Sequence, residues 1–165
     1  MAMFAGKRYV ILGAARQGKA LAAFAAARGA RVTLNDAQPR EKVDLSGLEN
    51  SAGIETVFGS HPLDLLDGCD VLCLSGGVPI DLPIVLEARR RGITVSNDTQ
   101  IFFELCPAPI IGITGSAGKT TTTTLVGEIL KKSSEFRVPS SEQASRNPGL
   151  ETRKSVWVGG NIAIR

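Results

Sequence analysis

The sequence predicts an α/β protein in which residues 1–106 form a doubly wound parallel sheet. Three observations support this fold class. Short apolar runs that stop at glycine or aspartate recur along the chain, helical segments lie between several of them, and the connections are short. With 43% hydrophobic and 21% charged residues, the 165-residue chain has the composition of a globular protein.

The first strand is predicted at residues 7–13, an apolar run rich in β-forming residues that stops at a glycine. Residues 16–29 follow as an alanine-rich helix with apolar residues at helical spacing and a terminal glycine. Residues 30–36 form a second apolar run, which ends in an aspartate. Strand, helix and strand with short turns make a βαβ unit, so the two strands are expected to be parallel.

Three further strands and two helices complete the first predicted domain. The strands are predicted at residues 53–59, 69–77 and 93–98, and the helices at 81–92 and 99–105. The run 69–77 is the most continuously apolar, as expected of a strand covered on both faces. Two prolines then mark a hinge at 107–109.

After the hinge, residues 110–165 are predicted to begin a second domain, because the strand-loop-helix pattern restarts. The predicted parts are a strand at 108–114, a loop at 115–119, a helix at 120–132, a flexible loop at 133–154 and a closing strand at 155–165. The flexible loop is polar, with two prolines and five serines.

A glycine loop, GAARQG, joins the first predicted strand to the first helix. Gly13 permits the tight turn and Gly18 a close helix approach, but Ala15 replaces the glycine that lets a pyrophosphate near the backbone. Asp36 is the acidic residue expected about 20 positions further on. The first domain is therefore predicted to be Rossmann-like and to bind a nucleotide diphosphate, with a plain βα turn as the alternative.

A second glycine loop precedes the helix at 120–132 and is a variant phosphate-binding loop (P-loop), with Ile113 where the strict pattern has glycine. Its backbone N–H groups can wrap phosphate oxygens. Lys119 would neutralise the ATP phosphates and Thr120 would coordinate Mg²⁺, which makes these two the predicted catalytic residues. The predicted ATP site comprises Thr114, Gly115, Ser116, Ala117, Gly118, Lys119, Thr120 and Thr121.

The residues after Lys119 are too few for the further strands, the magnesium carboxylate and the base-binding surface of a P-loop domain. The chain is therefore expected to hold an incomplete ATPase domain, to be a piece of a longer enzyme and to catalyse no ligation alone.

Other features exclude some partners. The net charge is +3 with scattered Lys and Arg, so nucleic acid is not expected. No apolar run reaches the ~18 to 20 residues of a membrane span. Residues 1–13 lack a signal-peptide pattern. Three cysteines, Cys69, Cys73 and Cys106, have apolar neighbours and are expected to be reduced and buried, which predicts a cytoplasmic protein. His61 is expected to be a solvated loop residue.

The segment GITGSAGKTTTTTLVGEIL is similar to the ATP loop of the Mur ligases, the ATP-dependent amino-acid ligases of peptidoglycan synthesis. VWVGGNI resembles the segment that follows this loop in the D-glutamate-adding members, and GAARQG, LND and SGGV resemble parts of their nucleotide-sugar domain. The resemblance implies a UDP-binding domain, an ATPase domain and an amino-acid domain. It also implies that ATP phosphorylates the carboxylate of UDP-N-acetylmuramoyl-L-alanine and that the amine of D-glutamate then attacks the acyl phosphate.

The resemblance further implies a UDP-sugar site. Its residues would be Gly13, Arg16, Gln17, Gly18, Asp36, Ser75, Gly76, Gly77 and Asn161. The backbone of Arg16 and Gln17 would bind the pyrophosphate, with Ser75 and Gly77 closing on it. Asp36 would accept from uracil, and Asn161 would reach the sugar.

The sequence departs from the family pattern at four places. Ala117 stands where the family often has asparagine, Gly76 replaces a frequent proline, Ala163 replaces a glycine, and 133–154 looks like an insertion. Two other functions remain open: an NAD-dependent oxidoreductase, in which Asp36 would bind a ribose, and a nucleotide-sensing module without enzymatic activity.

Overall fold

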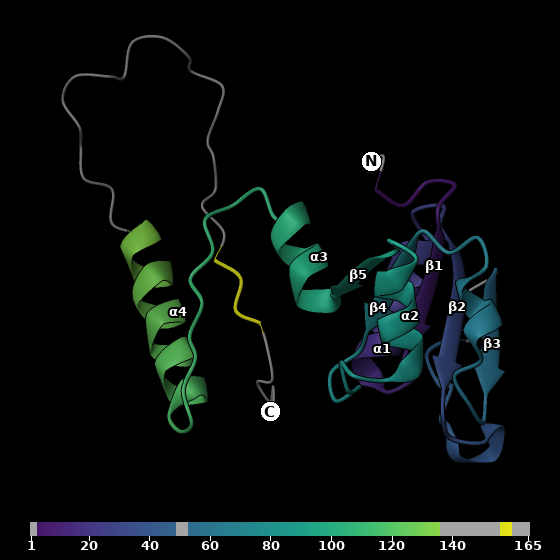
Figure 1. Ribbon diagram of the computed structural model, residues 1–165. Coiled ribbons are helices and arrows are strands. Elements are labelled where there is room, and N and C mark those ends of the chain that lie inside the picture. The colour runs from purple at the N-terminus through teal and green to yellow at the C-terminus, as the bar shows by residue number, and fades with distance from the viewer. Residues whose placement is uncertain (1–2, 49–52, 136–155, 160–165) are drawn as a thin grey trace, which may run out of the picture. The chain divides into compact units, whose positions relative to one another are not determined.

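A computed structural model describes residues 3–48, 53–135 and 156–159 of the chain (Figure 1). Internal contacts divide the chain into two compact units, Met1–Ala108 and Pro109–Arg165.

The first unit contains a five-stranded sheet in the order β3-β2-β1-β4-β5, and every pairing is parallel (Figure 1). The strands are β1 Arg8–Leu12, β2 Arg31–Asp36, β3 Ile54–Phe58, β4 Val71–Leu74 and β5 Thr94–Asn97. Each lies within the run predicted for it, so the α/β fold with a parallel sheet is confirmed.

Helices cover both faces of this sheet. Helices α1 (Arg16–Ala26) and α3 (Asp98–Leu105) supply buried residues to one apolar cluster. Helix α2 (Pro83–Arg90) and the 3₁₀ turn η2 (Leu63–Leu66) supply the other. A second 3₁₀ turn, η1 (Arg40–Lys42), lies between β2 and β3. Neither 3₁₀ turn was predicted, because three or four residues show no helical period.

The central strand β1 separates the two clusters. Tyr9 and Ile11 point into the first cluster and Val10 and Leu12 into the second, and all four are buried. Burying an aliphatic side chain such as Val10, Ile11 or Leu12 stabilises the fold by about 1.5–3 kcal/mol. The carboxyl end of β1, where the glycine loop begins, is thus held by packing on both sides.

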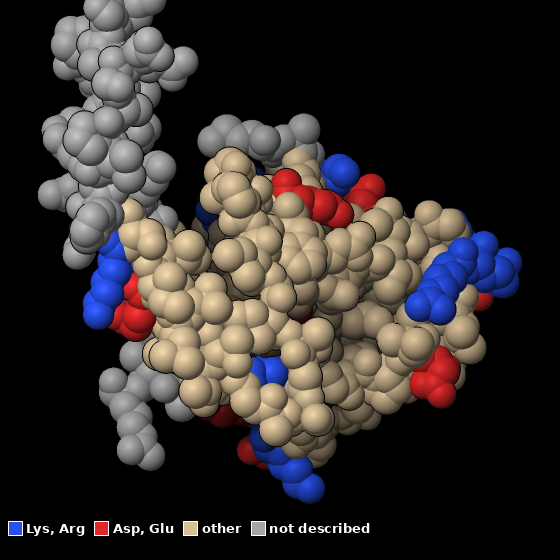
Figure 2. All heavy atoms as spheres, turned by 90° about the vertical axis from the view of Figure 1, so that its left-hand side faces the viewer, with Lys and Arg blue, Asp and Glu red and all other residues tan. Residues whose placement is uncertain are grey.

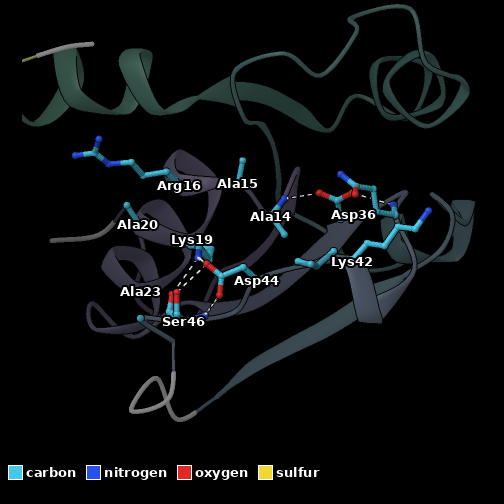
Figure 3. A pocket seen from close by; sticks show the side chains of 13 residues that line it. Ala14, Ala15, Arg16, Lys19, Ala20, Ala23, Asp36, Lys42, Asp44 and Ser46 are labelled. Carbon is cyan, nitrogen blue, oxygen red and sulfur yellow. Dashed lines mark hydrogen bonds and ion pairs between the residues drawn. The ribbon is translucent and has the colours of Figure 1, made fainter. Parts of the chain in front are cut away.

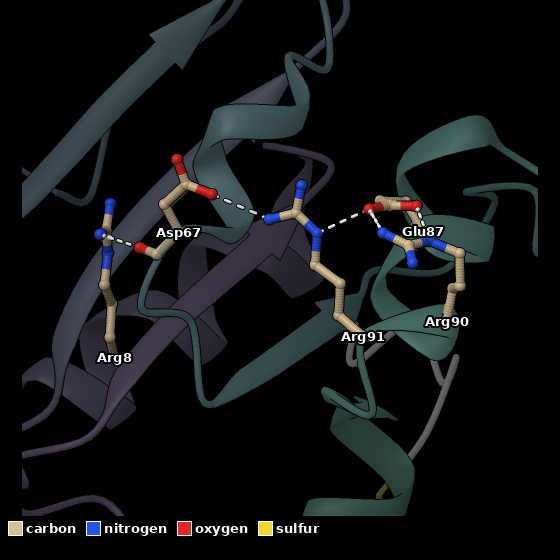
Figure 4. Close-up of polar contacts among 5 residues, drawn as sticks. All are labelled: Arg8, Asp67, Glu87, Arg90 and Arg91. Atoms are coloured by element: carbon tan, nitrogen blue, oxygen red, sulfur yellow. Dashed lines mark hydrogen bonds and ion pairs between the residues drawn. The ribbon is translucent and has the colours of Figure 1, made fainter.

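Ion pairs join the opposite, amino-terminal edge of the sheet to α2 (Figure 4). Arg91 Nη1 contacts Asp67 Oδ1 at 2.8 Å and its Nε contacts Glu87 Oε1 at 2.7 Å. Arg90 also pairs with Glu87, and Arg8 donates to the carbonyl of Asp67. Hydrogen bonds from Arg90 and then Arg91 lower the pKa of Glu87 to about 2. This network ties the turn before β4 to the end of α2.

The second unit contains one long helix, α4 (Lys119–Glu135). The described residues at 109–118 and 156–159 form no strand. The predicted strand at 108–114 is therefore wrong, and the one at 155–165 is wrong where it is described. An isolated strand has no neighbour to accept its backbone hydrogen bonds.

The helix α4 also extends past its predicted end. Ser133, Ser134 and Glu135 belong to it, so the predicted loop begins three residues too early. The rest of that predicted loop, 136–154, lies outside the described residues. Within the described part of the chain, no helix is long and apolar enough to cross a membrane.

Candidate nucleotide-binding site

The candidate site lies at the carboxyl edge of the sheet, where the loops after β1 and β4 separate. The chain leaves β1 toward α1 on one face and leaves β4 toward α2 on the other. Such a switch point opens the crevice in which open α/β sheets bind ligands. The N–H of Gly13 donates to Asn35 O at 2.8 Å, and the N–H of Ser75 donates to Leu12 O at 2.9 Å, so both loops start from fixed ladder positions.

Two glycines of the first loop are required by the backbone. Gly13 has φ +91°, a left-handed conformation that side chains rarely adopt. A Cβ on Gly18 would lie 1.8 Å from the carbonyl oxygen of Gly13. The helix α1 can therefore begin this close to β1 only with glycine at position 18.

The N-terminus of α1 has no side-chain cap, since its N-cap residue is Ala15. The first N–H groups of a helix lack intrahelical acceptors, and the helix dipole favours an anion there. Arg16 and Gln17 are the first two residues of α1. Their N–H groups therefore lie at the uncapped end of the helix, where an anion is favoured.

Asp36 joins the first loop to the turn after β2 (Figure 3). Its Oδ2 accepts the N–H of Ala14 at 2.8 Å and its Oδ1 accepts the N–H of Gln38 at 2.9 Å. A carboxylate has about four lone-pair sites, so capacity for a ligand remains after these two bonds. Asp36 therefore has a structural role that sequence reasoning did not assign.

A cavity of about 590 Å³ opens beside Asp36 (Figure 3). Three segments line it: the start of α1, the end of β2 with its turn, and the residues after η1. They are Ala14, Ala15, Arg16, Lys19, Ala20, Ala23, Asp36, Gln38, Lys42, Val43, Asp44, Ser46 and Gly47. The short side chains of Ala20 and Ala23 leave this space open along α1.

A second cavity of about 510 Å³ lies beside the loop after β4 and the start of α3. Gln17, Ser75, Gly76 and Gly77 all line it. Ser75 is 5% exposed, and its Oγ has no hydrogen-bond partner in the described part of the chain. A buried hydroxyl without a partner is costly, which favours a polar ligand at this position.

The structure thus gathers most of the predicted UDP-sugar residues at one edge. The eight are Gly13, Arg16, Gln17, Gly18, Asp36, Ser75, Gly76 and Gly77. Asn161 lies outside the described residues.

Asn35 and His61 support the same edge and were missed as a pair. Asn35 is fully buried, and its Nδ2 donates to the carbonyls of Val57 at 2.9 Å and Ser60 at 2.8 Å. His61 Nδ1 lies 2.5 Å from Asn35 Oδ1. His61 lies in a loop, as predicted, but it is half-buried and hydrogen-bonded rather than solvated. The sequence offered one signal for this pair: Asn35 is a polar residue inside a strand that was predicted from its apolar residues.

The predicted ATP residues form the second glycine loop and the first turns of α4. Gly118 has φ +74°, which only glycine adopts easily. The ammonium of Lys119 donates to the carbonyls of Gly115 and Ser116 and so lies over its own loop. Thr120 is exposed at the helix start. Among the described residues, no group of three His, Cys, Asp or Glu side chains could hold a metal ion.

The cysteines are free thiols in the structure. Cys69 and Cys73 are buried, whereas Cys106 is only half-buried, contrary to expectation. Burial, followed by the proximity of Cys69, raises the pKa of Cys73 to about 12. Cys69 and Cys73 are therefore core residues.

The charged side chains form no continuous basic patch on the face drawn in Figure 2, where Lys and Arg lie apart and several neighbour an acidic group. The expectation that nucleic acid is not a partner stays a prediction.

The strand order and the glycine loop after β1 define a Rossmann-like α/β protein, with two cavities at the carboxyl edge of its sheet. The chain belongs to the family described as the Mur ligase MurD-like N-terminal domain, whose profile matches residues 7–97.

Curated relatives support this assignment. The chain is 43% identical over 128 residues to a UDP-N-acetylmuramoylalanine–D-glutamate ligase of Shouchella clausii. This match covers 78% of the present chain and 28% of the relative. The chain is 38% identical over 157 residues to the ligase of the same name from Clostridium botulinum strain Hall, covering 94% of this chain and 30% of the relative. The chain thus spans less than a third of these relatives.

Solved structures show the same fold. A pseudomurein peptide ligase type C from Methanothermus fervidus matches with a TM-score of 0.51 and 25% identity, over 78% of this chain and 26% of that one. A murein peptide ligase from Psychrobacter arcticus matches with a TM-score of 0.52 and 25% identity, over 78% and 27%.

Proposed function

We propose that this chain is the UDP-sugar-binding domain and the beginning of the ATP-binding domain of a cytoplasmic ligase. The enzyme would use ATP to join D-glutamate to UDP-N-acetylmuramoyl-L-alanine in peptidoglycan synthesis. The observation that carries the proposal is the crevice at the ends of β1 and β4, with its uncapped helix and two flanking cavities. The curated relatives bear the name of this ligase.

In this proposal the UDP-sugar lies across the glycine loop. The uridine would occupy the cavity beside Asp36, and the diphosphate would accept from the N–H groups of Arg16 and Gln17. Ser75 would then have the partner that its buried Oγ lacks. The sugar would extend toward the second cavity.

The second glycine loop would bind ATP, which supplies the phosphoryl group that activates the substrate carboxylate. The left-handed Gly118 and the start of α4 fit a phosphate-binding loop. Lys119 would exchange its bonds to the loop carbonyls for bonds to phosphate oxygens, and Thr120 would ligate Mg²⁺. The alignment with the Clostridium relative covers 94% of this chain and so extends over this loop.

The test is calorimetric titration with UDP-N-acetylmuramoyl-L-alanine, with NADH and ATP–Mg²⁺ as comparisons. The proposal predicts saturable binding of the UDP-sugar. NADH binding without UDP-sugar binding would instead support the oxidoreductase. A nucleotide-sensing module would be favoured if Lys119→Ala left ATP affinity unchanged.

Site variants locate the binding. Ala23→Leu fills the cavity without removing a hydrogen bond and should weaken UDP-sugar binding on the order of tenfold. Ala27→Leu, an exposed position just beyond α1, is the matched control and should bind normally. Asp36→Ala should also weaken binding, but it releases the N–H of Ala14 as well. Equal binding by the Ala23 variant would place the ligand elsewhere.

A further inference from the structure

Lys19 is unusually enclosed for a lysine. It lies on α1 with its side chain only 15% exposed, at the wall of the cavity beside Asp36. Its Nζ contacts Asp44 Oδ2 at 3.2 Å and donates to the carbonyl of Ser46 at 3.0 Å (Figure 3). One ammonium thus reaches two residues of the connection between β2 and β3.

The segment that Lys19 contacts is held together by hydrogen bonds to Asp44. Asp44 Oδ1 accepts the N–H of Ser46 and Asp44 Oδ2 accepts the hydroxyl of Ser46, both at 2.8 Å. The bonds from the Ser46 N–H, the Ser46 hydroxyl and Lys19 lower the pKa of Asp44 to about 2. Asp44 is therefore a carboxylate at neutral pH.

We propose that Lys19, Asp44 and Ser46 form a clasp that positions the wall of the uridine pocket. Val43, Leu45 and Leu48 anchor the segment to the core on its apolar side, and the clasp fixes its polar side to α1. The distance between this segment and the small residues Ala20 and Ala23 sets the width of the cavity. Lys19 acts through Asp44 and Ser46 and is a positioning residue. This inference rests on the proposed function.

Lys19 could instead attract the anionic ligand directly. The two roles predict opposite effects of Asp44→Ala on UDP-sugar binding. If the clasp positions the wall, Lys19→Met and Asp44→Ala both weaken UDP-sugar binding. If Lys19 acts by charge alone, Asp44→Ala removes a competing anion and binding becomes stronger. Glu128→Ala, which breaks an exposed ion pair with Lys131 in α4 and changes the net charge equally, is the control.

The experiment is a double-mutant cycle on the full chain, measured by calorimetric titration with UDP-N-acetylmuramoyl-L-alanine. We expect each single variant to bind roughly fivefold more weakly, the double variant to be no weaker than either, and Lys19→Arg to restore most of the affinity. Amide hydrogen exchange in residues 43–48 of the free chain should accelerate in both single variants.

Unchanged affinity in both single variants, or tighter binding by Asp44→Ala, would overturn the clasp while leaving the proposed function intact. If the unmodified chain bound no UDP-sugar, both the proposed function and the pocket's role would fail.

Discussion

Asn35 and Asp36 are neighbours in the sequence and hold different parts of the same sheet edge. Asn35 donates to one carbonyl at the end of β3 and to one in the loop after it, and its side-chain oxygen contacts His61 in that loop. Asp36 fixes the glycine loop through Ala14. Each side chain hydrogen-bonds backbone groups of the loops at this edge, so the loops around the crevice are held in place while the crevice stays open.

Tyr9 allows a test of burial at a single residue. It is 1% exposed, stacks on Phe4 and donates its hydroxyl to Met3 O at 2.9 Å. Burial raises its pKa to about 12. Because the folded state favours the neutral phenol, this contribution to stability is complete below a pH of about 10 and is lost as the pH rises toward about 12.

Tyr9 is the single tyrosine of the chain, so its ionisation can be followed directly by absorbance. The folded chain should ionise near pH 12 and the denatured chain near pH 10. A midpoint near pH 10 in the folded chain would show that the ring is accessible to solvent.

The elements at the site depend on one close approach, that of α1 to the end of β1. Gly18 makes this approach against a backbone carbonyl, which cannot move without breaking the ladder of the central strand. A Cβ on Gly76 would lie 2.4 Å from the Oε1 atom of Gln17, which is less close and involves the end of a flexible side chain. Glycine is therefore necessary at the first position and replaceable at the second.

Gly18→Ala should destabilise the chain on the order of 2 kcal/mol, because α1 must shift away from β1. It should also abolish UDP-sugar binding. Gly76→Ala is the matched substitution in the same crevice and should change stability by less than about 0.5 kcal/mol. Urea unfolding followed by circular dichroism measures both. Similar midpoints for the two variants would contradict the argument.

In the molecule as a whole, the two units differ in how much apolar surface they bury. The first unit has two apolar clusters around a complete five-stranded sheet. In the second, the described part of α4 leaves Leu125, Ile129 and Leu130 exposed, and Trp157 is 91% exposed. A helix with few buried contacts contributes little cooperative stability.

The units should therefore unfold separately. The single tryptophan, Trp157, belongs to the second unit and the single tyrosine, Tyr9, to the first. Urea titration should show tryptophan fluorescence changing at lower urea, or hardly at all, while the near-ultraviolet signal of Tyr9 shows a cooperative transition. Coincident transitions would mean that the units fold as one.

Much of the first unit could be predicted from the sequence because its signals are local. Apolar runs and the glycines that end them located all five strands and three helices. The glycine loop and Asp36 were recognisable for the same reason, since their spacing follows from one βαβ unit. The strand predicted at 108–114 failed because an apolar run becomes a strand only beside another strand.

The fold class, the glycine loop and the family resemblance follow from the sequence alone, because each depends on the order of residues along the chain. Which distant residues meet depends on how the chain packs in three dimensions. Lys19 contacts Asp44 and Ser46, and Asn35 contacts His61, because the parallel sheet brings the carboxyl ends of β1, β2 and β3 to one edge. No local pattern encodes such contacts, since they arise from strand order and packing.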